Sequence, residues 1–392
     1  MHEADVVVIG GGSAGLCAAV AAARAGARTV LIERSAMLGG MGTLAKVHTF
    51  CGLYHPDVSQ PPVVANAGLP EEIERMMRER TGAGPVKMGK VYVLPQDPAA
   101  FAQIARELVE AEELLEVRME TQCTAISKGD GFLIETSAGS LRAKALVDAS
   151  ADAVVAALLG QQRLSVEPAK NQRSAFVFSL RGVKAEGMVE DFRMKLALGI
   201  VRAVAAGELP EAALGTAGRA SALAGEIYFT TDLDPAPAEE LMATGTELAG
   251  KVSDFLRRNF PEYAEAEGPF CAEQPGVRET YRWEGEYLLT EVDLLTGKEF
   301  PDTVAYATWP IELRETTRGA RMRYFEKPVP GNIPLRCLMS RNVPGVFFAG
   351  RCISATHEAL ASVRVMGTCF ATGQAAGKAA AGFGVGVSRA YS

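Results

Sequence analysis

Residues 5–26, DVVVIGGGSAGLCAAVAAARAG, restrict the fold more than any other part of the sequence. The run begins with β-branched residues, which are typical of a strand buried within a parallel sheet. A cluster of glycines follows, and small residues with high helix propensity then continue to Gly26, a residue suited to end a helix. Residues 28–33, RTVLIE, predict a second strand. The order of strand, glycine turn, helix and strand predicts a β–α–β unit of a parallel sheet.

The glycines of this unit have the spacing G-x-G-x-x-G, with Gly10, Gly12 and Gly15 at the fixed positions. In a dinucleotide-binding turn the first glycine permits the tight bend and the second lets a pyrophosphate approach the backbone. The third lets the helix pack closely on the strand. The N-terminus of the helix offers unpaired N–H groups and the positive end of its dipole to the phosphates. Glu33 follows Gly15 by 18 residues, where a carboxylate accepts hydrogen bonds from an adenosine ribose.

The composition excludes several other classes of protein. The chain has 392 residues, 48% of them hydrophobic, which is enough for about two domains. A net charge of -7 without a basic run argues against nucleic-acid binding, which needs clustered Lys and Arg. The seven cysteines are scattered without a C-x-x-C pair. We therefore expect neither a disulfide framework nor a metal site, and we expect a reducing, cytoplasmic location.

Residues 6–23 carry no charge over a length that approaches that of a membrane span. The acidic residues before them do not fit the basic start of a signal peptide, and a spanning helix would not place a glycine cluster near its start. A strand that turns into a buried helix explains the segment, so we expect no membrane span.

The glycine motif fits both NAD and FAD, and residues 34–43, RSAMLGGMGT, favour FAD. A second glycine loop offers further backbone N–H groups to phosphate or ribityl, where NAD domains usually continue into another helix. The motifs resemble those of FAD enzymes of the glutathione-reductase superfamily. That resemblance implies that the strand around Thr124 covers the adenine, and that residues 149–151, Ala-Ser-Ala, match an Ala-Thr-Gly loop at the flavin without its glycine. Asp152 could also cap the helix that follows.

The rest of the chain predicts a discontinuous arrangement. Residues 161–344 change character, with helices expected at 185–206 and 236–259 among aromatic-rich strands. They contain no second G-x-G-x-x-G after a strand, and the redox C-x-x-x-x-C of disulfide reductases is also missing. Residues 342–351 return to an apolar strand. We therefore predict the α/β fold class, with a discontinuous Rossmann-like FAD-binding domain (residues 1–160 and 345–392) and an inserted α+β substrate domain (residues 161–344). A helix is also expected at 96–113, with Asp97 as its N-cap.

Residues 276–295, 306–315 and 332–338, together with the opening stretch, resemble the bacterial family labelled FAD-dependent oxidoreductase. This resemblance implies a tightly bound FAD and leaves the substrate open. Relatives often carry Asp-x-His where this chain has Glu312-Leu313-Arg314, so that histidine's role in proton transfer does not carry over. The residues predicted to contact FAD are Gly10, Gly12, Ser13, Ala14, Gly15, Glu33, Arg34, Gly40, Met41, Thr43, Thr124, Ala149, Gly350, Arg351, Val363, Arg364, Val365 and Met366.

Residues 350–369, GRCISATHEALASVRVMGTC, supply most of the C-terminal contacts in this prediction. Gly350 and Arg351 would lie by the ribityl and pyrophosphate, and a small-residue helix beginning near Arg364 would point its first N–H groups at the flavin pyrimidine. His357 falls in the predicted loop between them, where it would act as a base or orient substrate, or else be a structural histidine. Arg364 would pair with a substrate carboxylate, with the charge of reduced flavin, or with a buried acid.

Two further segments carry candidate groups. His48, in the loop at residues 46–57, could be a catalytic residue or, like Cys51, a covalent attachment point for flavin. In residues 277–283, VRETYRW, alternation would put Arg278 and Arg282 on one face of a strand. There they would grip an anionic substrate or pair with acids across the sheet.

The predicted function is that of an FAD-dependent dehydrogenase or oxidase. A small organic substrate would transfer a hydride to flavin N5, and oxygen, a quinone or a protein carrier would reoxidise the flavin. The alternative is a non-redox or electron-relaying flavoprotein subunit of a complex. A homo-oligomer or an electron-acceptor partner is possible in either case.

Overall fold

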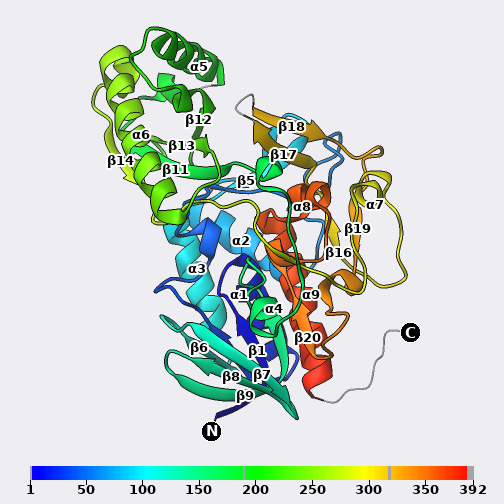
Figure 1. Ribbon diagram of the computed structural model, residues 1–392. Coiled ribbons are helices and arrows are strands. Elements are labelled where there is room, and N and C mark those ends of the chain that lie inside the picture. The colour runs from blue at the N-terminus through cyan, green and yellow to red at the C-terminus, as the bar shows by residue number, and fades with distance from the viewer. Residues whose placement is uncertain (1, 189, 317–318, 386–392) are drawn as a thin grey trace.

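The structure is a computed structural model that describes residues 2–188, 190–316 and 319–385 (Figure 1). Its central sheet has the order β6-β2-β1-β9-β8-β7, and β20 also pairs with β9. Strands β6, β2, β1, β9 and β20 pair in parallel, whereas β7, β8 and β9 form an antiparallel meander. The bounds are β1 His2–Ile9, β2 Thr29–Ile32, β6 Leu115–Arg118, β7 Cys123–Gly129, β8 Gly131–Thr136, β9 Gly139–Asp148 and β20 Val346–Phe348.

The β-branched run of the opening segment forms the interior of this sheet. Val6, Val7 and Val8 are fully buried, because helices cover one face of the sheet and the meander and later segments cover the other. The predicted strands at residues 5–10 and 28–33 are confirmed as β1 and β2. A strand buried on both faces needs no alternation of polar and apolar residues, which explains the unbroken hydrophobic pattern.

Helix α1 (Ser13–Arg24) packs directly against the last helix of the chain, α9 (Met366–Gly384). A Cβ atom added to Gly373 would lie 2.1 Å from the carbonyl oxygen of Ala14, and one added to Gly377 would lie 2.1 Å from that of Ala18. The two helices therefore approach to backbone contact, which only glycine allows at these positions. This close crossing is why both helices consist mainly of small residues.

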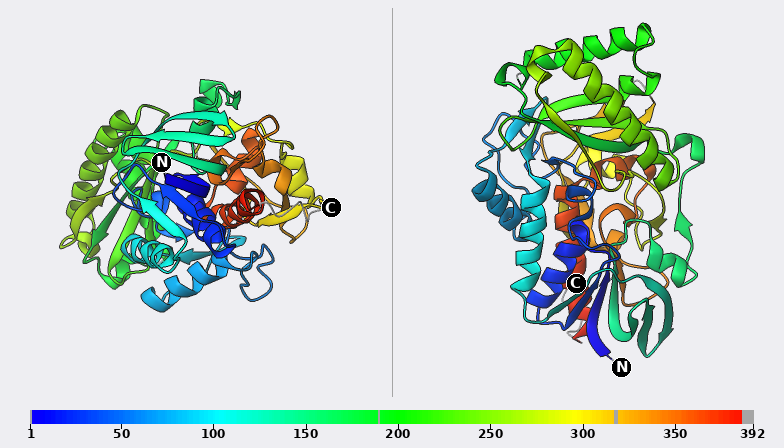
Figure 2. Two further views of the ribbon diagram at one scale, coloured as in Figure 1. Left: turned by 90° about the horizontal axis from the view of Figure 1, so that it is seen from below. Right: turned by 90° about the vertical axis from the view of Figure 1, so that its left-hand side faces the viewer.

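A second sheet lies at the other end of the molecule, with the order β12-β13-β11-β14. Figures 1 and 2 show it far from the N-terminus, covered on its outer side by helices α5 and α6. Phe176, Phe178, Phe229 and Tyr263 contribute to a separate hydrophobic core between this sheet and its helices. The bounds are β11 Ser174–Arg181, β12 Thr216–Ala220, β13 Glu226–Leu233, β14 Glu267–Cys271, α5 Glu190–Ala205 and α6 Ala238–Asn259.

Smaller elements fill the space between and beside the two sheets. The remaining helices are α2 Leu69–Thr81, α3 Pro98–Glu110, α4 Val154–Leu158, α7 Glu291–Thr296 and α8 His357–Val363. The remaining strands are β3 Thr49–Phe50, β4 Val86–Met88, β5 Val91–Pro95, β10 Arg163–Leu164, β15 Arg282–Trp283, β16 Thr303–Ala307, β17 Ile311–Thr316, β18 Gly319–Arg323 and β19 Gly331–Pro334.

Most predicted helices are confirmed, and one segment differs. In α3 the Asp97 carboxylate accepts a hydrogen bond from the N–H of Ala100 at 2.8 Å, as expected of an N-cap. Helices α5 and α6 match the predictions at 185–206 and 236–259 within a few residues. His357 does not lie in a loop, however. It begins the short helix α8, because the Thr356 hydroxyl caps that helix by accepting from the N–H of Ala359.

The architecture is therefore mixed α/β around a parallel sheet, with the glycine turn at the carboxyl end of β1. None of the described helices is long and apolar enough to cross a lipid bilayer.

Candidate functional site: a cavity with a glycine-loop end and an arginine end

A cavity of about 450 Å³ lies where the parallel strands end and the second sheet begins. Its volume is typical of ligand clefts, which enclose roughly 300–1,000 Å³. Open α/β sheets bind ligands at the carboxyl ends of their strands, and this cavity takes residues that follow β1, β2, β9 and β20. We call this part the glycine-loop end (residues 10–14, 33–35 and 149–152). The opposite part, with Arg278, Arg314 and Arg364, is the arginine end.

Two glycines give the glycine-loop end its shape. Gly10 has a φ of +100°, and a Cβ atom there would lie 2.6 Å from the carbonyl oxygen of Ala149. A Cβ atom at Gly15 would lie 1.7 Å from the carbonyl oxygen of Gly10. The turn is thus pressed between β9 and the first turn of α1. A larger residue at either glycine would force these elements apart.

Glu33 ties the glycine turn to the end of β2. One carboxylate oxygen accepts from the N–H of Gly11 at 2.6 Å, and the other accepts from the N–H and hydroxyl of Ser35 at 2.8 and 2.7 Å. The same side chain lines the cavity. Glu33 therefore braces the loop in addition to the ribose contact that its position predicts.

The loop after β9 contains an alanine where the resemblance implies a glycine. Ala151 has a φ of +70°, in the left-handed region that costs a non-glycine residue roughly 1–2 kcal/mol. The predicted cap of the following helix is also different. The Ser150 hydroxyl accepts from the N–H of Val154 at 3.0 Å, while Asp152 pairs with Arg351 at 2.6 Å. Asp152 is therefore a partner of Arg351, and Ser150 takes the capping role.

His48 lies in the wall of the cavity, buried to 2% exposure and stacked on Tyr228 with ring centroids 4.7 Å apart. Its Nε2 is 3.9 Å from a carboxylate oxygen of Glu226. Burial lowers the pKa of His48 below its ordinary value, although Glu226 acts in the opposite direction. The imidazole is therefore neutral at neutral pH and can accept a proton.

The neighbouring acid and thiol have defined protonation states as well. Burial opposes ionisation of Glu226, but hydrogen bonds from Ser221, Arg181 and Ser179 hold the pKa of its carboxyl below the usual range. Glu226 is thus a carboxylate beside His48. Burial raises the pKa of the Cys51 thiol to about 12, so this cavity residue is a neutral thiol at neutral pH and not a nucleophilic thiolate.

The arginine end is held together by two carboxylates. Asp232 forms an ion pair with Arg278 at 2.7 Å and accepts a hydrogen bond from Arg314 at 2.6 Å. Glu312 accepts from Arg314 at 2.6 Å and, through its other oxygen, from the indole N–H of Trp309 at 2.9 Å. Burial opposes ionisation of both acids, but the arginines outweigh it and lower the pKa of each carboxyl. Both acids are therefore charged.

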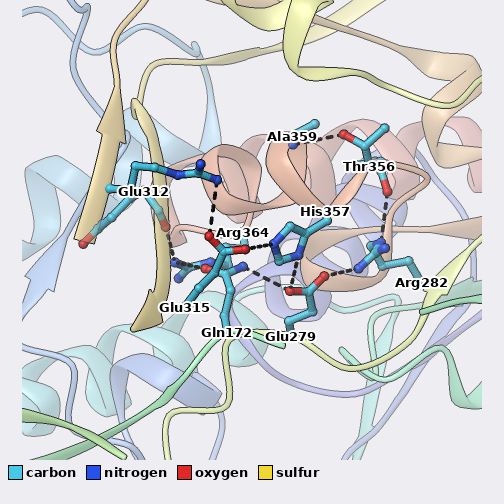
Figure 3. A network of polar contacts seen from close by, with 11 residues as sticks. Gln172, Glu279, Arg282, Glu312, Glu315, Thr356, His357, Ala359 and Arg364 are labelled. Atoms are coloured by element: carbon cyan, nitrogen blue, oxygen red, sulfur yellow. Dashed lines mark hydrogen bonds and ion pairs between the residues drawn. The ribbon is translucent and has the colours of Figure 1, made fainter. Parts of the chain in front are cut away.

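Arg364 differs from the other two arginines. One terminal nitrogen donates to the amide oxygen of Gln172 and to the backbone oxygen of Glu312, each at 3.2 Å (Figure 3). Its buried Nε has no hydrogen-bond partner among the residues that the structure describes. Burial, followed by the positive charge of Arg278, lowers the pKa of Arg364 to about 10. The guanidinium still carries its charge at neutral pH, beside the cavity and without a carboxylate of its own.

His357 lies behind this wall in a network of charged side chains (Figure 3). Its Nδ1 is 2.7 Å from Glu279, and its Nε2 is 3.2 Å from Glu315. Burial opposes the charged imidazolium, but the two carboxylates outweigh it and raise the pKa of His357. Glu279 also bonds Arg282 and accepts from Gln172 at 3.3 Å, and Gln172 in turn accepts from Arg364.

The cavity brings together most of the residues predicted from the sequence. Those that line it are Gly10, Gly12, Ser13, Ala14, Glu33, Arg34, Gly40, Met41, His48, Ala149, Gly350, Arg351, Arg364, Val365 and Met366. Those that do not line it are Gly15, Thr43, Thr124, Val363 and His357.

The residues outside the lining have structural contacts instead. The Thr43 hydroxyl donates to the backbone oxygen of Leu38 at 2.8 Å, and that of Thr124 donates to Glu135 at 3.2 Å while its neighbour Cys123 lines the cavity. Val363 is fully buried in the core. The predicted small-residue helix is confirmed as α9, which begins at Met366, just after the expected start near Arg364, because Arg364 ends α8 and Val365 is the N-cap of α9.

The expected shared face of Arg278 and Arg282 is wrong. Only Arg282 and Trp283 belong to a strand, and Arg278 lines the cavity while Arg282 is buried behind it, donating to Ala355 and Glu279. Arg278 pairs with Asp232, one of the two alternatives left open by the sequence.

Comparison with families of known proteins matches residues 5–383 to the family described as FAD dependent oxidoreductase. The chain belongs to this family. The match covers both sheets and therefore the whole cavity. A search of curated proteins gives no match.

Three solved structures with a similar arrangement are distant in sequence. Glycine oxidase from Geobacillus kaustophilus is 13% identical with a TM-score of 0.49, covering 100% of this chain and 97% of its own. A geranylgeranyl bacteriochlorophyll reductase-like protein from Thermoplasma acidophilum is also 13% identical, with a TM-score of 0.49 and coverage of 97% and 78%. The p-nitrophenol 4-monooxygenase of Pseudomonas putida is 15% identical, with a TM-score of 0.43 and coverage of 91% and 74%.

The glycine-loop end fits the FAD of this family. A Cβ atom at Gly12 would meet no atom within 4 Å, so this residue faces open space. Within the described part of the chain, no hydrogen bond uses the N–H group of Ala14, and the first turn of α1 has no acidic residue. An unused N–H group at the positive end of a helix is suited to the pyrophosphate of a dinucleotide. Among the described residues, no group of three or more His, Cys, Asp or Glu side chains could hold a metal ion.

The sequence-based prediction missed part of the arginine end. Tyr228 and Asp232 lie on β13, in a segment that matches no sequence motif. Glu312 and Arg314 entered the sequence analysis only as a departure from the family pattern. A single sequence offered one usable signal, which is that acids and arginines recur within otherwise apolar strands.

Proposed function

We propose that this protein oxidises a small organic substrate at a bound FAD, with the substrate at the arginine end of the cavity. One observation carries the proposal: a single cavity joins the glycine-loop end to a wall that holds a neutral, buried histidine and an arginine without a carboxylate partner. When bound, FAD supplies the acceptor for a hydride from the substrate. The family match supports the redox class.

In this proposal the chain holds FAD mainly through its backbone. The N–H group of Ala14 binds the pyrophosphate, and Glu33 binds the adenosine ribose while it keeps the loop in position. Val365 and Met366 begin α9, whose N-terminus would offer N–H groups to the pyrimidine edge of the flavin. The pairing of Arg351 with Asp152 fixes the loop between these two contacts.

His48 is the proposed base. Its lowered pKa keeps it neutral near pH 7, and Tyr228 holds the ring in place by stacking. When His48 takes a proton from the substrate, the carboxylate of Glu226 at 3.9 Å stabilises the imidazolium that forms. We do not assign this role to His357, since it does not line the cavity and both its ring nitrogens are held by carboxylates.

The division into an FAD domain (1–160 and 345–392) and a substrate domain (161–344) belongs to this proposal. The pairing of β20 with β9 and the separate core of the second sheet support it. The proposal also includes a cytoplasmic location, which the seven free cysteines support, and reoxidation of the flavin by oxygen, a quinone or a protein carrier.

The absorption spectrum of the purified protein tests the proposal, followed by anaerobic mixing with candidate donors. We expect a yellow protein that releases its flavin into the supernatant on acid precipitation and whose absorption near 450 nm is bleached by a substrate. A colourless protein that also fails to take up added FAD would contradict the cofactor assignment. A yellow protein that no donor bleaches would favour an electron-relaying subunit instead.

A further inference from the structure

The arginine end carries one positive charge more than its acids balance. Three guanidinium groups, those of Arg278, Arg314 and Arg364, face two carboxylates, those of Asp232 and Glu312. All five side chains are ionised at neutral pH, because the arginines keep the acids charged and an arginine does not lose its proton there. Among these five side chains the surplus is therefore one unit of positive charge; Arg219, which also lines the cavity, lies outside this group.

The acids next to this cluster are paired with positive charges of their own. Arg173 pairs with Asp234 at 2.6 Å. Behind the cavity wall Arg282 and His357 share the carboxylates of Glu279 and Glu315. With His357 protonated these four charges balance, and Glu315 also pairs with Arg321 at 3.3 Å, so no carboxylate here is left over to supply the missing negative charge.

Arg364 is the residue that carries the surplus. Arg278 and Arg314 each contact Asp232 directly, whereas Arg364 contacts an amide oxygen and a backbone oxygen. Its Nε is buried and lacks a hydrogen-bond partner in the described part of the chain. A partly buried guanidinium without a carboxylate partner favours an anionic ligand, and a fork of guanidinium N–H groups at a cavity wall is suited to a planar carboxylate.

We propose that the substrate is a small carboxylic acid whose carboxylate binds Arg364 at the arginine end of the cavity. A carboxylate brings one negative charge, which matches the surplus, whereas a phosphate monoester brings about -1.5 to -2. Val177, Tyr228, Trp309 and Val365 line the same part and leave room for a short apolar body. This inference rests on the proposed function, because it names the substrate class of that site.

Calorimetric titration of the FAD-loaded protein tests the inference with three matched probes: butyrate, butyramide and propylphosphonate. Butyrate should bind at least about tenfold more tightly than butyramide, because a charge-assisted hydrogen bond replaces a neutral one. It should also bind more tightly than the phosphonate. Equal affinity for butyrate and butyramide, or preference for the phosphonate, would overturn the inference without any variant.

Three variants then locate the anion. Arg364→Gln should weaken butyrate binding at least about tenfold and leave butyramide binding unchanged. Arg364→Lys keeps the charge but loses the forked N–H donors, so its affinity for butyrate should lie between those of the parent protein and Arg364→Gln. Glu312→Gln removes a negative charge from the same wall and should strengthen butyrate binding. Arg106→Gln, on the exposed surface of α3 with a side chain 66% exposed, is the matched control and should bind like the parent protein.

The outcomes for the two proposals can be told apart. Undiminished butyrate binding by a folded, FAD-loaded Arg364→Gln protein would overturn the inference. The remaining role for Arg364 would then be to balance the negative charge of reduced FAD. Arg364-dependent butyrate binding by a protein whose FAD no acid reduces would support the anion site and contradict the proposed oxidation.

Discussion

The two ends of the cavity recognise their ligands in different ways. The glycine-loop end presents the backbone of a few consecutive residues, held in shape by Gly10, Gly15 and the bracing carboxylate of Glu33. The arginine end presents side chains that meet across long separations, such as Arg314 with Asp232, 82 positions apart, and Arg364 with Gln172, 192 apart. The first end depends on space for the backbone and the second on a balance of charge. Substitutions should therefore affect them differently.

The largest expected effect is steric and at the glycine-loop end. Gly15→Ala places a Cβ atom 1.7 Å from the backbone oxygen of Gly10, so we expect a loss of more than about 3 kcal/mol in the free energy of unfolding and no bound FAD. Gly12→Ala is the matched control, because its Cβ atom meets nothing within 4 Å. It should keep the stability of the FAD-free protein within about 0.5 kcal/mol while it weakens FAD binding. Urea unfolding and flavin content measure both, and equal destabilisation by the two changes would contradict the packing argument.

The next effect is electrostatic and at the arginine end. Asp232→Asn leaves Arg278 and Arg314 without their shared carboxylate, so the free energy of unfolding should fall by about 3 kcal/mol. Asp234→Asn is the control on the same segment, since its side chain is 83% exposed and its pair with Arg173 should contribute at most about 1 kcal/mol. FAD content should be normal in both variants. Loss of FAD together with stability in Asp232→Asn would mean that the two ends are not independent.

A smaller effect is expected at His48, where a substitution should lower the rate of turnover without loss of FAD. His48→Gln removes the proposed base, so kcat should fall about 100-fold while FAD remains bound. Because burial lowers the pKa of His48, kcat/KM of the parent protein should decline only below about pH 6.5, as His48 becomes protonated. The variant should lack this decline. His55→Gln, in the same loop outside the cavity lining, should retain both the rate and the pH profile.

The smallest expected effect concerns the network behind the arginine end. His357 faces Glu279 and Glu315 directly, with Glu358 nearby and Arg282 on the far side of Glu279, and the carboxylates raise its pKa. A raised pKa in the folded state means that His357 stabilises the fold fully below its unfolded pKa of about 6.5. This stabilisation is lost as pH rises through the higher folded value.

The measurement is unfolding free energy against pH for the parent protein and for His357→Gln. Across that pH window the parent protein should lose unfolding free energy, by a smaller amount than the Asp232→Asn change removes. The unfolding free energy of His357→Gln should show no such loss. Affinity for butyrate should decline over the same pH window, because neutral His357 removes the positive charge that balances Glu279 and Glu315. A parallel decline in the variant would show that another group titrates.

The elements that the sequence predicted correctly are those whose contacts are local. Strand β1, the glycine turn and helix α1 follow from consecutive residues, and the Asp97 cap of α3 satisfies a backbone N–H three residues away. Such interactions depend on spacing along the chain, which a single sequence displays.

Errors arose where a side chain found a distant partner. His357 fell in a predicted loop, yet Thr356 caps a helix there and two acids from residues 279 and 315 hold its ring. Alternation placed Arg278 and Arg282 on one face, but the segment is mostly not a strand, and separate acids draw the two guanidinium groups apart. Neither outcome could be predicted, because no local pattern records which acid lies opposite which arginine.

The sequence by itself determined the parallel sheet and the dinucleotide turn, because these follow from β-branched runs and from glycines at fixed spacing, and the second glycine loop at residues 34–43 favoured FAD over NAD. Only the tertiary structure decided that His48 and not His357 faces the cavity, and that Arg364 remains without a carboxylate. The physical reason is that burial and charge balance belong to the folded assembly. The neutral state of His48 and the unbalanced charge of Arg364 both depend on the segments that fold around these side chains.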